Sequence, residues 1–326
     1  MNRLDLIVNE YRQNEIPSAV IICGPTCSGK SSLAIETAEK LNGEIISCDS
    51  MQIYKHMNVG TAKPSPEDMQ KIPHHMIDIC EPWENYNVFL YKGSATQVIR
   101  DIISRGKVPV ICGGTGLYVN SLIDNRHYVD EDSEECIPER FRDDLQLALS
   151  LYSQGEYSRL HGILEKYDPE ASKAFHKNNS KRVLRALKLY FLTGQTRTER
   201  EEASLKVSAD LNFNTFVLTS ERDTLYRNID NRVDSMREQG LYEEAVRVYE
   251  LCREKANATD AAFDHRSLNS LAAIGYREFY EYPQRLNGRL TAEAIGECFD
   301  KIKQDTRHYA KRQITWFKKT PGAVYI

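Results

Sequence analysis

The sequence predicts an α/β fold: a P-loop-type doubly wound parallel sheet core with a helical insertion domain and C-terminal helices. Short apolar runs alternate with amphipathic helical segments through the first 125 residues, and a glycine-rich motif follows the first run directly. The alternation then stops until an apolar run returns near residue 215. Because consecutive parallel strands need a crossover, alternating strands and helices indicate βαβ units.

The expected strands are short, mostly apolar segments bounded by glycine or polar residues. They cover residues 18–23, 44–48, 75–79, 108–112 and 215–218. The first is continuously apolar after Ser18, which is typical of a strand buried on both faces. Helices are expected over residues 30–41 and 87–104, and again directly after Gly116. The strand at 215–218 returns the chain to the core after the helical stretch.

These elements divide the chain into three segments. Residues 1–125 form the first part of the core, 126–207 a helical insertion, and 208–326 the rest of the core with the C-terminal helices. The acidic stretch 130–135 is expected to be a solvated linker or a helix edge, and Asp168-Pro169 is a helix start with proline at the first position. The last helix should begin after Thr291 and run to about Lys319, with one apolar face made of Ile295, Phe299, Ile302, Tyr309 and Trp316.

Composition places the chain among ordinary globular proteins. It has 326 residues, 41% of them hydrophobic, and 43 basic against 47 acidic side chains give a net charge of −4. A uniformly basic nucleic-acid binder is therefore not expected, although local basic patches remain open. No run approaches the roughly 20 apolar residues of a membrane span, and the N-terminus lacks a signal-peptide pattern. We therefore expect no membrane contact. The eight cysteines form no CxxC pair, so we expect reduced thiols and a cytoplasmic location.

The glycine-rich motif after the first strand matches G-x-x-x-x-G-K-[ST] in the context that the motif requires, between a strand and a helix. Its glycines let backbone N–H groups turn inward toward phosphate oxygens, and the helix adds its positive N-terminus. The lysine supplies a charge for the terminal phosphate, and the serine can ligate Mg²⁺. The expected phosphate-binding residues are Gly24, Pro25, Thr26, Cys27, Ser28, Gly29, Lys30 and Ser31, with Ser31 as the metal ligand.

Two features argue against an ordinary nucleotide kinase. The strand 108–112 ends in the glycine turn Gly113–Gly116 rather than in an aspartate that steadies Mg²⁺, and no compact arginine-rich lid is present. Asp78 is an open candidate, either for the metal or as a strand-end cap. Asp49 follows the second strand and Thr115 lies in the glycine turn, so both should face the crevice beyond the strand ends. There Asp49 can serve as a general base, or simply cap a turn.

Two basic stretches stand out in this slightly acidic chain. Residues 177–188 carry five Lys or Arg and no acid, and residues 300–319 carry seven against two acids, with aromatic residues interleaved. A helix with such a charge run is often only a solvated face. Concentrated positive charge nevertheless binds a phosphate backbone by releasing counterions, so both stretches are candidate nucleic-acid contacts.

These motifs together resemble the tRNA dimethylallyltransferase (tRNA isopentenyltransferase) family. The resemblance runs in order from about residue 18 to 319 and is specific. Its matching segments, besides the P-loop, are 49–54, 60–64, 74–75, 113–118, 168–169, 182–187, 231–234, 274–276 and 305–317.

The resemblance implies transfer of the dimethylallyl group of dimethylallyl diphosphate to N6 of the adenosine immediately 3′ of the anticodon, tRNA position 37. Asp49 matches the catalytic aspartate and would accept the N6 proton. Thr115 and Arg232 match residues that stabilise the leaving diphosphate together with Thr26, Lys30, Ser31 and the Mg²⁺ cofactor, and Arg227 is a competitor of Arg232. The resemblance also suggests a monomer.

The same resemblance implies that the adenosine is extruded into the crevice and that the insertion clamps the anticodon stem-loop. Three segments match tRNA-contacting regions. Lys181 replaces a residue that is often glutamine, which favours phosphate contact, and Ala272 replaces a residue that is often basic. The expected tRNA contacts are Asp49, Ser50, Met51, Gln52, Lys181, Arg182, Val183, Leu184, Arg185, Gly275, Tyr276 and Arg277.

Three other functions remain open on the sequence alone. An adenine-nucleotide isopentenyltransferase would share the chemistry, but a mononucleotide does not need the insertion or the basic helices. A small-molecule P-loop kinase would share the phosphate loop. A non-catalytic RNA-binding module would bind tRNA without forming a product.

Overall fold

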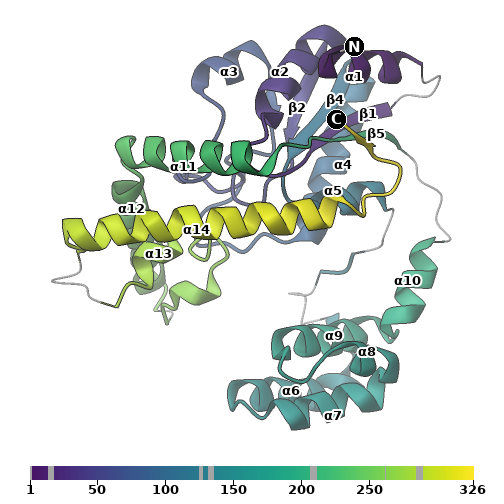
Figure 1. Ribbon diagram of the computed structural model, residues 1–326. Coiled ribbons are helices and arrows are strands. Elements are labelled where there is room, and N and C mark those ends of the chain that lie inside the picture. Colours follow the sequence, from purple (N-terminus) through teal and green to yellow (C-terminus); the bar gives the residue numbers. More distant parts are fainter. Residues whose placement is uncertain are drawn as a thin grey trace. The chain divides into compact units, whose positions relative to one another are not determined.

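The computed structural model describes residues 2–13, 18–124, 128–130, 136–205, 211–260, 262–283 and 289–326 (Figure 1). The chain forms two compact units. Unit 1 joins Met1–Ile123 to Leu211–Ile326, and unit 2 is Asp124–Asp210. Unit 1 therefore contains both ends of the chain.

The centre of unit 1 is a six-stranded sheet in the order β3-β2-β4-β1-β5-β6, in which every neighbouring pair is parallel. This confirms the predicted fold class. The central strand β1 pairs with β4 through Val20 and Val110, and with β5 through Val20 and Asn214. The strands are β1 (Ser18–Cys23), β2 (Gly43–Ser47), β3 (His74–His75), β4 (Val108–Gly113), β5 (Asn212–Val217) and β6 (Val324–Tyr325).

The expected strand over 75–79 is wrong in extent, because β3 contains only His74 and His75. Met76 and Asp78 have φ angles of 62° and 54°, in the left-handed region that interrupts an extended strand. The two-residue strand β6 is exposed and too short to show a pattern in the sequence.

Helices cover the sheet. α1 (Arg3–Arg12) and α2 (Lys30–Leu41) pack against one side through a cluster that includes Val20, Ile22 and Val110. α2 has the predicted bounds, because Leu33, Ala34 and Ala38 form a buried stripe and Asn42 ends the helix with a φ of 52°. α4 (Val88–Ser104) and α5 (Gly116–Ile123) also contact the strands and lie outside that cluster. They meet each other through the stacked rings of Tyr91 and Tyr118, 3.9 Å apart.

The C-terminal helices of unit 1 enclose a second apolar core. It includes Tyr54, Tyr276 and Phe279, all of them fully buried. The elements here are α11 (Arg222–Glu238), α12 (Leu241–Ala258), η3 (His265–Ser267), α13 (Arg277–Tyr280) and α14 (Ala292–Phe317), the long yellow helix of Figure 1. The short helix α3 (Pro66–Lys71) lies outside this core and has no buried residue.

The predicted start of the last helix is confirmed, because the Thr291 hydroxyl accepts a hydrogen bond from the Ala294 N–H. Its predicted apolar face is partly wrong. Trp316 is 44% exposed, and the neighbouring Phe317 is buried in its place.

Unit 2 is helical, and its described residues include no strand. Asp168 caps α8 through the Ala171 N–H, and Pro169 follows it as predicted. The acidic residues 131–135 lie outside the described residues. The helices are η2 (Glu139–Phe141), α6 (Arg142–Ser153), α7 (Tyr157–Tyr167), α8 (Pro169–Ala174), α9 (Ser180–Thr193) and α10 (Arg197–Leu205).

No helix within the described parts of the two units is both long and apolar enough to cross a membrane.

A buried carboxylate stabilises the end of the sheet where β2 and β4 begin. The Glu44 side chain is only 3% exposed and accepts two hydrogen bonds from Arg105, at 2.6 and 2.8 Å. Lys107 and His75 each contact it at 2.8 Å. These partners, Arg105 above all, hold the pKa of the Glu44 carboxyl well below its usual range.

We predict that Glu44→Gln lowers the free energy of unfolding by about 1–3 kcal/mol, because a neutral amide cannot satisfy three basic partners. Urea unfolding at pH 7 measures the change. Since the folded pKa is depressed, the stabilisation is present above the unfolded pKa of about 4.3 and declines as pH falls below it. The wild-type advantage over the variant should therefore shrink in acid.

Asp101→Asn is the matched control. Asp101 also pairs with Arg105, but its side chain is 61% exposed. Its removal should change stability by less than about 1 kcal/mol. Equal effects of the two variants would contradict the assignment of Glu44 as the centre of the cluster.

Candidate active site

The phosphate loop connects β1 to α2. Gly24 has a φ of +146°, and a Cβ there would lie 2.8 Å from the carbonyl oxygen of Leu218, so only glycine fits. Gly29 precedes α2 with a φ of +87° and offers no side-chain cap, which leaves the first-turn N–H groups for a ligand. Cys27, a non-glycine residue with a φ of 60°, adds backbone strain of the kind found at binding sites.

Lys30 and the loop serines provide the polar groups of the site. The Lys30 Nζ donates to the Pro25 carbonyl at 2.5 Å, and burial lowers the pKa of this lysine. The Ser28 hydroxyl is buried and has no hydrogen-bond partner within the described ranges, a costly state that an oxyanion would relieve. Ser31 lines the neighbouring cavity. The loop therefore suits an anionic ligand.

The glycine turn after β4 packs directly against the loop and α14. The side chain of Gln313, on α14, accepts from the Thr26 N–H at 2.9 Å and donates to the Gly114 carbonyl at 2.8 Å. A Cβ on Gly114 would collide with the Gln313 amide, and one on Gly113 with the backbone of Cys48. Neither glycine has a positive φ, so close approach rather than turn conformation explains them.

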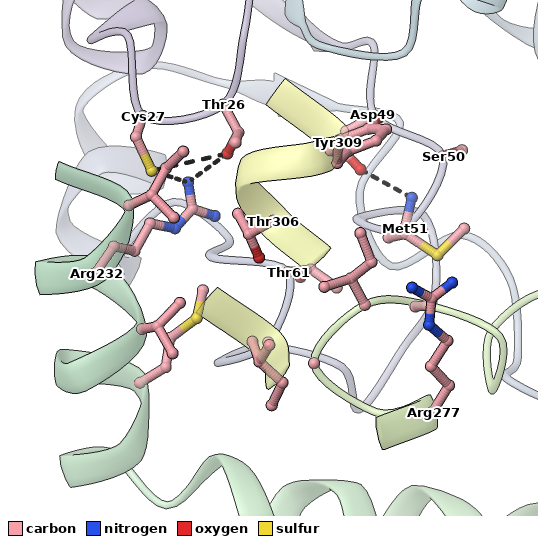
Figure 2. Close-up of a pocket in the computed structure, with 18 of the residues that line it drawn as sticks. Thr26, Cys27, Asp49, Ser50, Met51, Thr61, Arg232, Arg277, Thr306 and Tyr309 are labelled. Atoms are coloured by element: carbon pink, nitrogen blue, oxygen red, sulfur yellow. Dashed lines mark hydrogen bonds between the residues drawn. The ribbon is translucent and has the colours of Figure 1, made fainter. Parts of the chain in front are cut away.

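Asp49 lies beyond the carboxyl end of β2, as predicted. Its Oδ1 accepts from the Met51 N–H at 2.9 Å, which fixes the side chain in a turn (Figure 2). The Thr115 hydroxyl accepts from the Ser50 N–H at 3.0 Å, so it holds the same segment from the glycine turn. Thr115 lines neither cavity, and its contact with the diphosphate stays a prediction.

Two cavities adjoin at these residues. One, of about 400 Å³, contains Lys30 and Ser31; the other, of about 300 Å³, extends between α11, α14 and the segment 273–277. Burial raises the pKa of Tyr309, at their junction, to about 12, so its hydroxyl stays protonated at neutral pH. The residues that line both cavities are Thr26, Asp49, Thr61, Arg232 and Tyr309.

Arg232, on α11, reaches the phosphate loop. Its Nη1 donates to the Thr26 hydroxyl at 3.1 Å and contacts the Cys27 sulfur at 3.7 Å, as Figure 2 shows. Arg227 is exposed and lines neither cavity, so the structure places Arg232 at the site. Asp78 pairs with the buried ammonium of Lys63 at 2.5 Å and lines neither cavity.

The second cavity has an apolar wall that motif analysis did not identify. Its residues come from three separate segments of the chain. The only sequence signal for it was the helical spacing of apolar residues on α11, which indicates a buried face. They are Ile229, Val233, Met236, Ala273, Ile274 and Ile302.

Glu244 was also missed, because a lone glutamate on a helix carries no signal. Its carboxylate accepts from the N–H groups of Asn58 and Val59 at 2.9 Å and of Gly60 at 3.0 Å. The Tyr276 hydroxyl adds a fourth hydrogen bond at 2.7 Å. Glu244 thereby holds the loop that brings Gly60 and Thr61 to the cavity.

Several predicted tRNA contacts need correction. Val183 is fully buried in the core of unit 2, and Leu184 packs against it, because they form the inward face of α9. Tyr276 is fully buried with its hydroxyl on Glu244. The Gln52 amide bonds to Ser47, Thr61 and Ala62, so base recognition would require these bonds to break.

The other predicted contacts lie at the surface or in the cavity. Ser50, Met51, Gly275 and Arg277 line the second cavity, although the Arg277 guanidinium also pairs with Asp305 at 2.9 Å. Lys181, Arg182 and Arg185 are exposed on α9, in unit 2.

Part of the predicted basic surface on α14 is neutralised. Lys303 and Arg307 pair with Asp234 and Asp230 of α11, at 2.6 and 2.5 Å. Lys301 pairs with Asp305 at 3.0 Å. The sequence count of +5 for residues 300–319 therefore overstates the positive charge available there.

Comparisons with known proteins agree on one family. A family model described as IPP transferase matches residues 52–320, and one described as Isopentenyl transferase matches residues 17–79. A protein of Halalkalibacterium halodurans named tRNA dimethylallyltransferase is 41% identical over 307 residues, covering 94% of this chain and 90% of the relative. One of Lachnoclostridium phytofermentans with the same name is 39% identical over 307 residues, with the same coverage.

Solved structures give the same result. The full-length tRNA isopentenylpyrophosphate transferase of Bacillus halodurans aligns with a TM-score of 0.62 and 38% identity, over 95% of this chain and 90% of that one. A eukaryotic dimethylallyltransferase described as acting on tRNA aligns with a TM-score of 0.78 and 28% identity, over 95% and 74%.

We predict that Lys30→Met weakens the binding of inorganic diphosphate at least tenfold, because it removes the only lysine of the loop. In the wild type, affinity should also fall as pH rises through the lowered pKa of Lys30, since the neutral amine must take up a proton on binding. Isothermal titration calorimetry of both proteins across alkaline pH separates this effect from the ionisation of diphosphate itself.

Lys40→Met, on the exposed part of the same helix, is the control and should leave affinity unchanged. A Lys30→Met protein that binds diphosphate like the wild type would contradict the assignment of the loop.

Proposed function

This chain belongs to the IPP transferase family, and we propose from this premise that it transfers the dimethylallyl group of dimethylallyl diphosphate to N6 of the adenosine immediately 3′ of the anticodon of tRNA. One observation carries the chemistry. The phosphate-loop cavity and the apolar-walled cavity adjoin at Thr26, Asp49 and Arg232. A diphosphate leaving group and an adenine acceptor can therefore meet beside one carboxylate.

In this proposal the diphosphate lies in the phosphate loop. The backbone N–H groups before α2, the Lys30 ammonium and the Arg232 guanidinium face its oxygens. Cleavage of the allylic C–O bond leaves its electron pair on the diphosphate, and these positive groups stabilise the added charge. The apolar wall of Ile229, Val233 and Met236 suits the dimethylallyl chain and excludes water that would hydrolyse it.

Asp49 is proposed as the base. As the N6–C bond forms at the allylic carbon, the amine becomes positively charged and must lose a proton, which the Asp49 carboxylate accepts. Its Oδ1 is fixed by the Met51 N–H, which leaves Oδ2 directed to substrate. The products are N6-dimethylallyladenosine in the tRNA and free diphosphate.

Mg²⁺ is proposed as the cofactor. The donor set fits an ion of this kind, which prefers oxygen ligands and is held by few protein groups together with substrate phosphates. Ser31, in the first turn of α2 and on the wall of the phosphate-loop cavity, would hold it. When bound, Mg²⁺ offsets the charge of the diphosphate.

An adenosine in a stacked anticodon loop cannot reach this cavity, so the proposal requires that it be flipped out of the stack. The exposed basic residues Lys181, Arg182 and Arg185 of unit 2 support a role in binding the phosphates of the anticodon stem-loop. We further propose that the protein is a monomer and that it is cytoplasmic. The cytoplasmic location suits a chain whose eight cysteines are all free thiols.

The decisive experiment incubates the protein with tRNA, dimethylallyl diphosphate and Mg²⁺ and analyses the nucleosides by mass spectrometry. N6-dimethylallyladenosine at the position 3′ of the anticodon is the expected product. Absence of that nucleoside would overturn the proposal, and a preference for AMP over an anticodon stem-loop in a competition assay would favour the nucleotide-prenylating alternative.

We predict that Asp49→Asn reduces single-turnover prenyl transfer by about 10²–10⁴-fold, the contribution of a positioned general base. The asparagine keeps an oxygen that can accept from the Met51 N–H, so the loop stays in place. Affinity for tRNA, measured by filter binding, should stay within about threefold. Transfer at a rate close to that of the wild type would refute Asp49 as the base.

We predict that Lys181→Glu weakens anticodon stem-loop binding and lowers the slope of log affinity against log salt by about 1, as expected for one lost phosphate contact. Lys173→Glu, at an exposed lysine of α8 that pairs with Glu170, is the control. Diphosphate affinity should stay unchanged in both. Identical salt slopes for Lys181→Glu and the wild type would exclude a phosphate contact at Lys181.

A further inference from the structure

A groove next to the apolar-walled cavity lies on unit 1, where the C-terminal half of α14 faces α5. It encloses about 570 Å³ and takes no part in the chemistry proposed above. Its lining residues are Asn120, Lys311, Arg312, Thr315, Trp316 and Lys319.

The indole of Trp316 forms a preorganised surface in this groove. Its Nε1 donates a long hydrogen bond to the Asn120 Oδ1 at 3.4 Å, and its ring lies so close to Gly116 that a Cβ there would collide with it. The ring is thus positioned by α5, yet 44% of the residue is exposed. A fixed, exposed aromatic surface is suited to stacking.

The rim of the groove is positive. Lys311, Arg312 and Lys319 line it, and no acidic residue does. In the described part of the chain none of the three pairs with a carboxylate, unlike Lys303 and Arg307 further back on α14. Arg312 instead lies over the Tyr309 ring, 5.8 Å from its centre.

The groove continues toward the reaction site along α14. Arg312 lines both the groove and the apolar-walled cavity, and Tyr309 lines both cavities. Tyr309 and Trp316 are seven residues apart, which is about 10 Å along a helix. A chain that enters the cavity at Tyr309 can therefore pass over Trp316.

We propose that this groove binds a nucleotide of the substrate RNA that neighbours the flipped adenosine, with its base stacked on Trp316 and its phosphates beside Lys311 and Lys319. The proposal rests on the tRNA prenylation proposed above and adds a second contact outside the catalytic cavity. An RNA occupant is favoured over a protein, because lysine is depleted at the core of protein interfaces whereas two lysines flank this ring.

Intrinsic fluorescence tests the stacking directly, because the chain has only two tryptophans, Trp83 and Trp316. In Trp83→Phe the remaining Trp316 should be quenched by an anticodon stem-loop RNA, and not by dimethylallyl diphosphate alone. The matched variant Trp316→Phe retains Trp83, which is partly buried against the apolar core, and should show little quenching.

Binding and kinetics provide the second arm. Trp316→Ala should weaken stem-loop affinity about tenfold or more, as expected for the loss of one stacked base. The KM for the stem-loop should rise accordingly, while kcat and diphosphate affinity stay unchanged. Trp316→Phe should bind within about threefold of the wild type, because a phenyl ring still offers a stacking face. Lys311→Glu should lower the salt slope by about 1.

The proposal for the groove and the proposed function can be refuted separately. If the wild type transfers no prenyl group, the proposed function falls, and quenching and affinity, which need no turnover, still test the groove. If Trp316→Ala binds the stem-loop within twofold of the wild type and Trp316 is not quenched, the groove does not bind RNA. Dissociation of a wild-type dimer by Trp316→Ala in sedimentation, with RNA binding unchanged, would equally overturn the proposal.

Discussion

The site depends on a phosphate loop whose backbone N–H groups are held ready for an anion. Such a loop must not satisfy those groups internally, so its shape has to be imposed from outside. Three side chains hold the loop by hydrogen bonds. Gln313 accepts from the Thr26 N–H, Arg232 donates to the Thr26 hydroxyl, and Asn228 donates to the Cys27 carbonyl at 3.4 Å. All three come from helices late in the chain. The loop is therefore preorganised by long-range contacts rather than by its own sequence.

This dependence explains why the chain returns to the core after unit 2. Gln313 lies 287 residues beyond Thr26, and its amide also binds Gly114 of the second glycine turn. One buried side chain of α14 thus joins two strand-to-helix junctions, the one after β1 and the one after β4. A helical insertion is tolerated because its two ends leave from residues 123 and 211, outside these junctions. Both halves of unit 1 are needed to complete one cavity.

The local features of the sequence predicted the fold well. The strand β1, the helix α2, and the caps of Asp168 and Thr291 follow from patterns within a few residues. The P-loop motif and Asp49 were found because their chemistry needs particular residue types at fixed spacing. Glu244 and the apolar wall were not, because each residue is ordinary alone and its role arises only from partners distant in the chain. Val183 and Tyr276 were misassigned because a motif does not reveal which way its side chains point.

The basic residues of α14 are a second case in which the sequence does not reveal the partners of a side chain. The run of basic residues on α14 looked uniform in the sequence, yet the structure divides it into two parts. Nearer the N-terminus of α14, Lys303 and Arg307 form ion pairs with acidic residues of α11. These ion pairs join the two helices that form one wall of the apolar-walled cavity. Past Tyr309, Ala310 and Ile314 still pack against Leu225 and Ile229 of α11, whereas Trp316 faces α5. The lining of the groove there carries no acid to pair with Lys311 or Lys319. The same residue types therefore stabilise the cavity at one end and leave positive charge for a ligand at the other, and only the packing partner decides which.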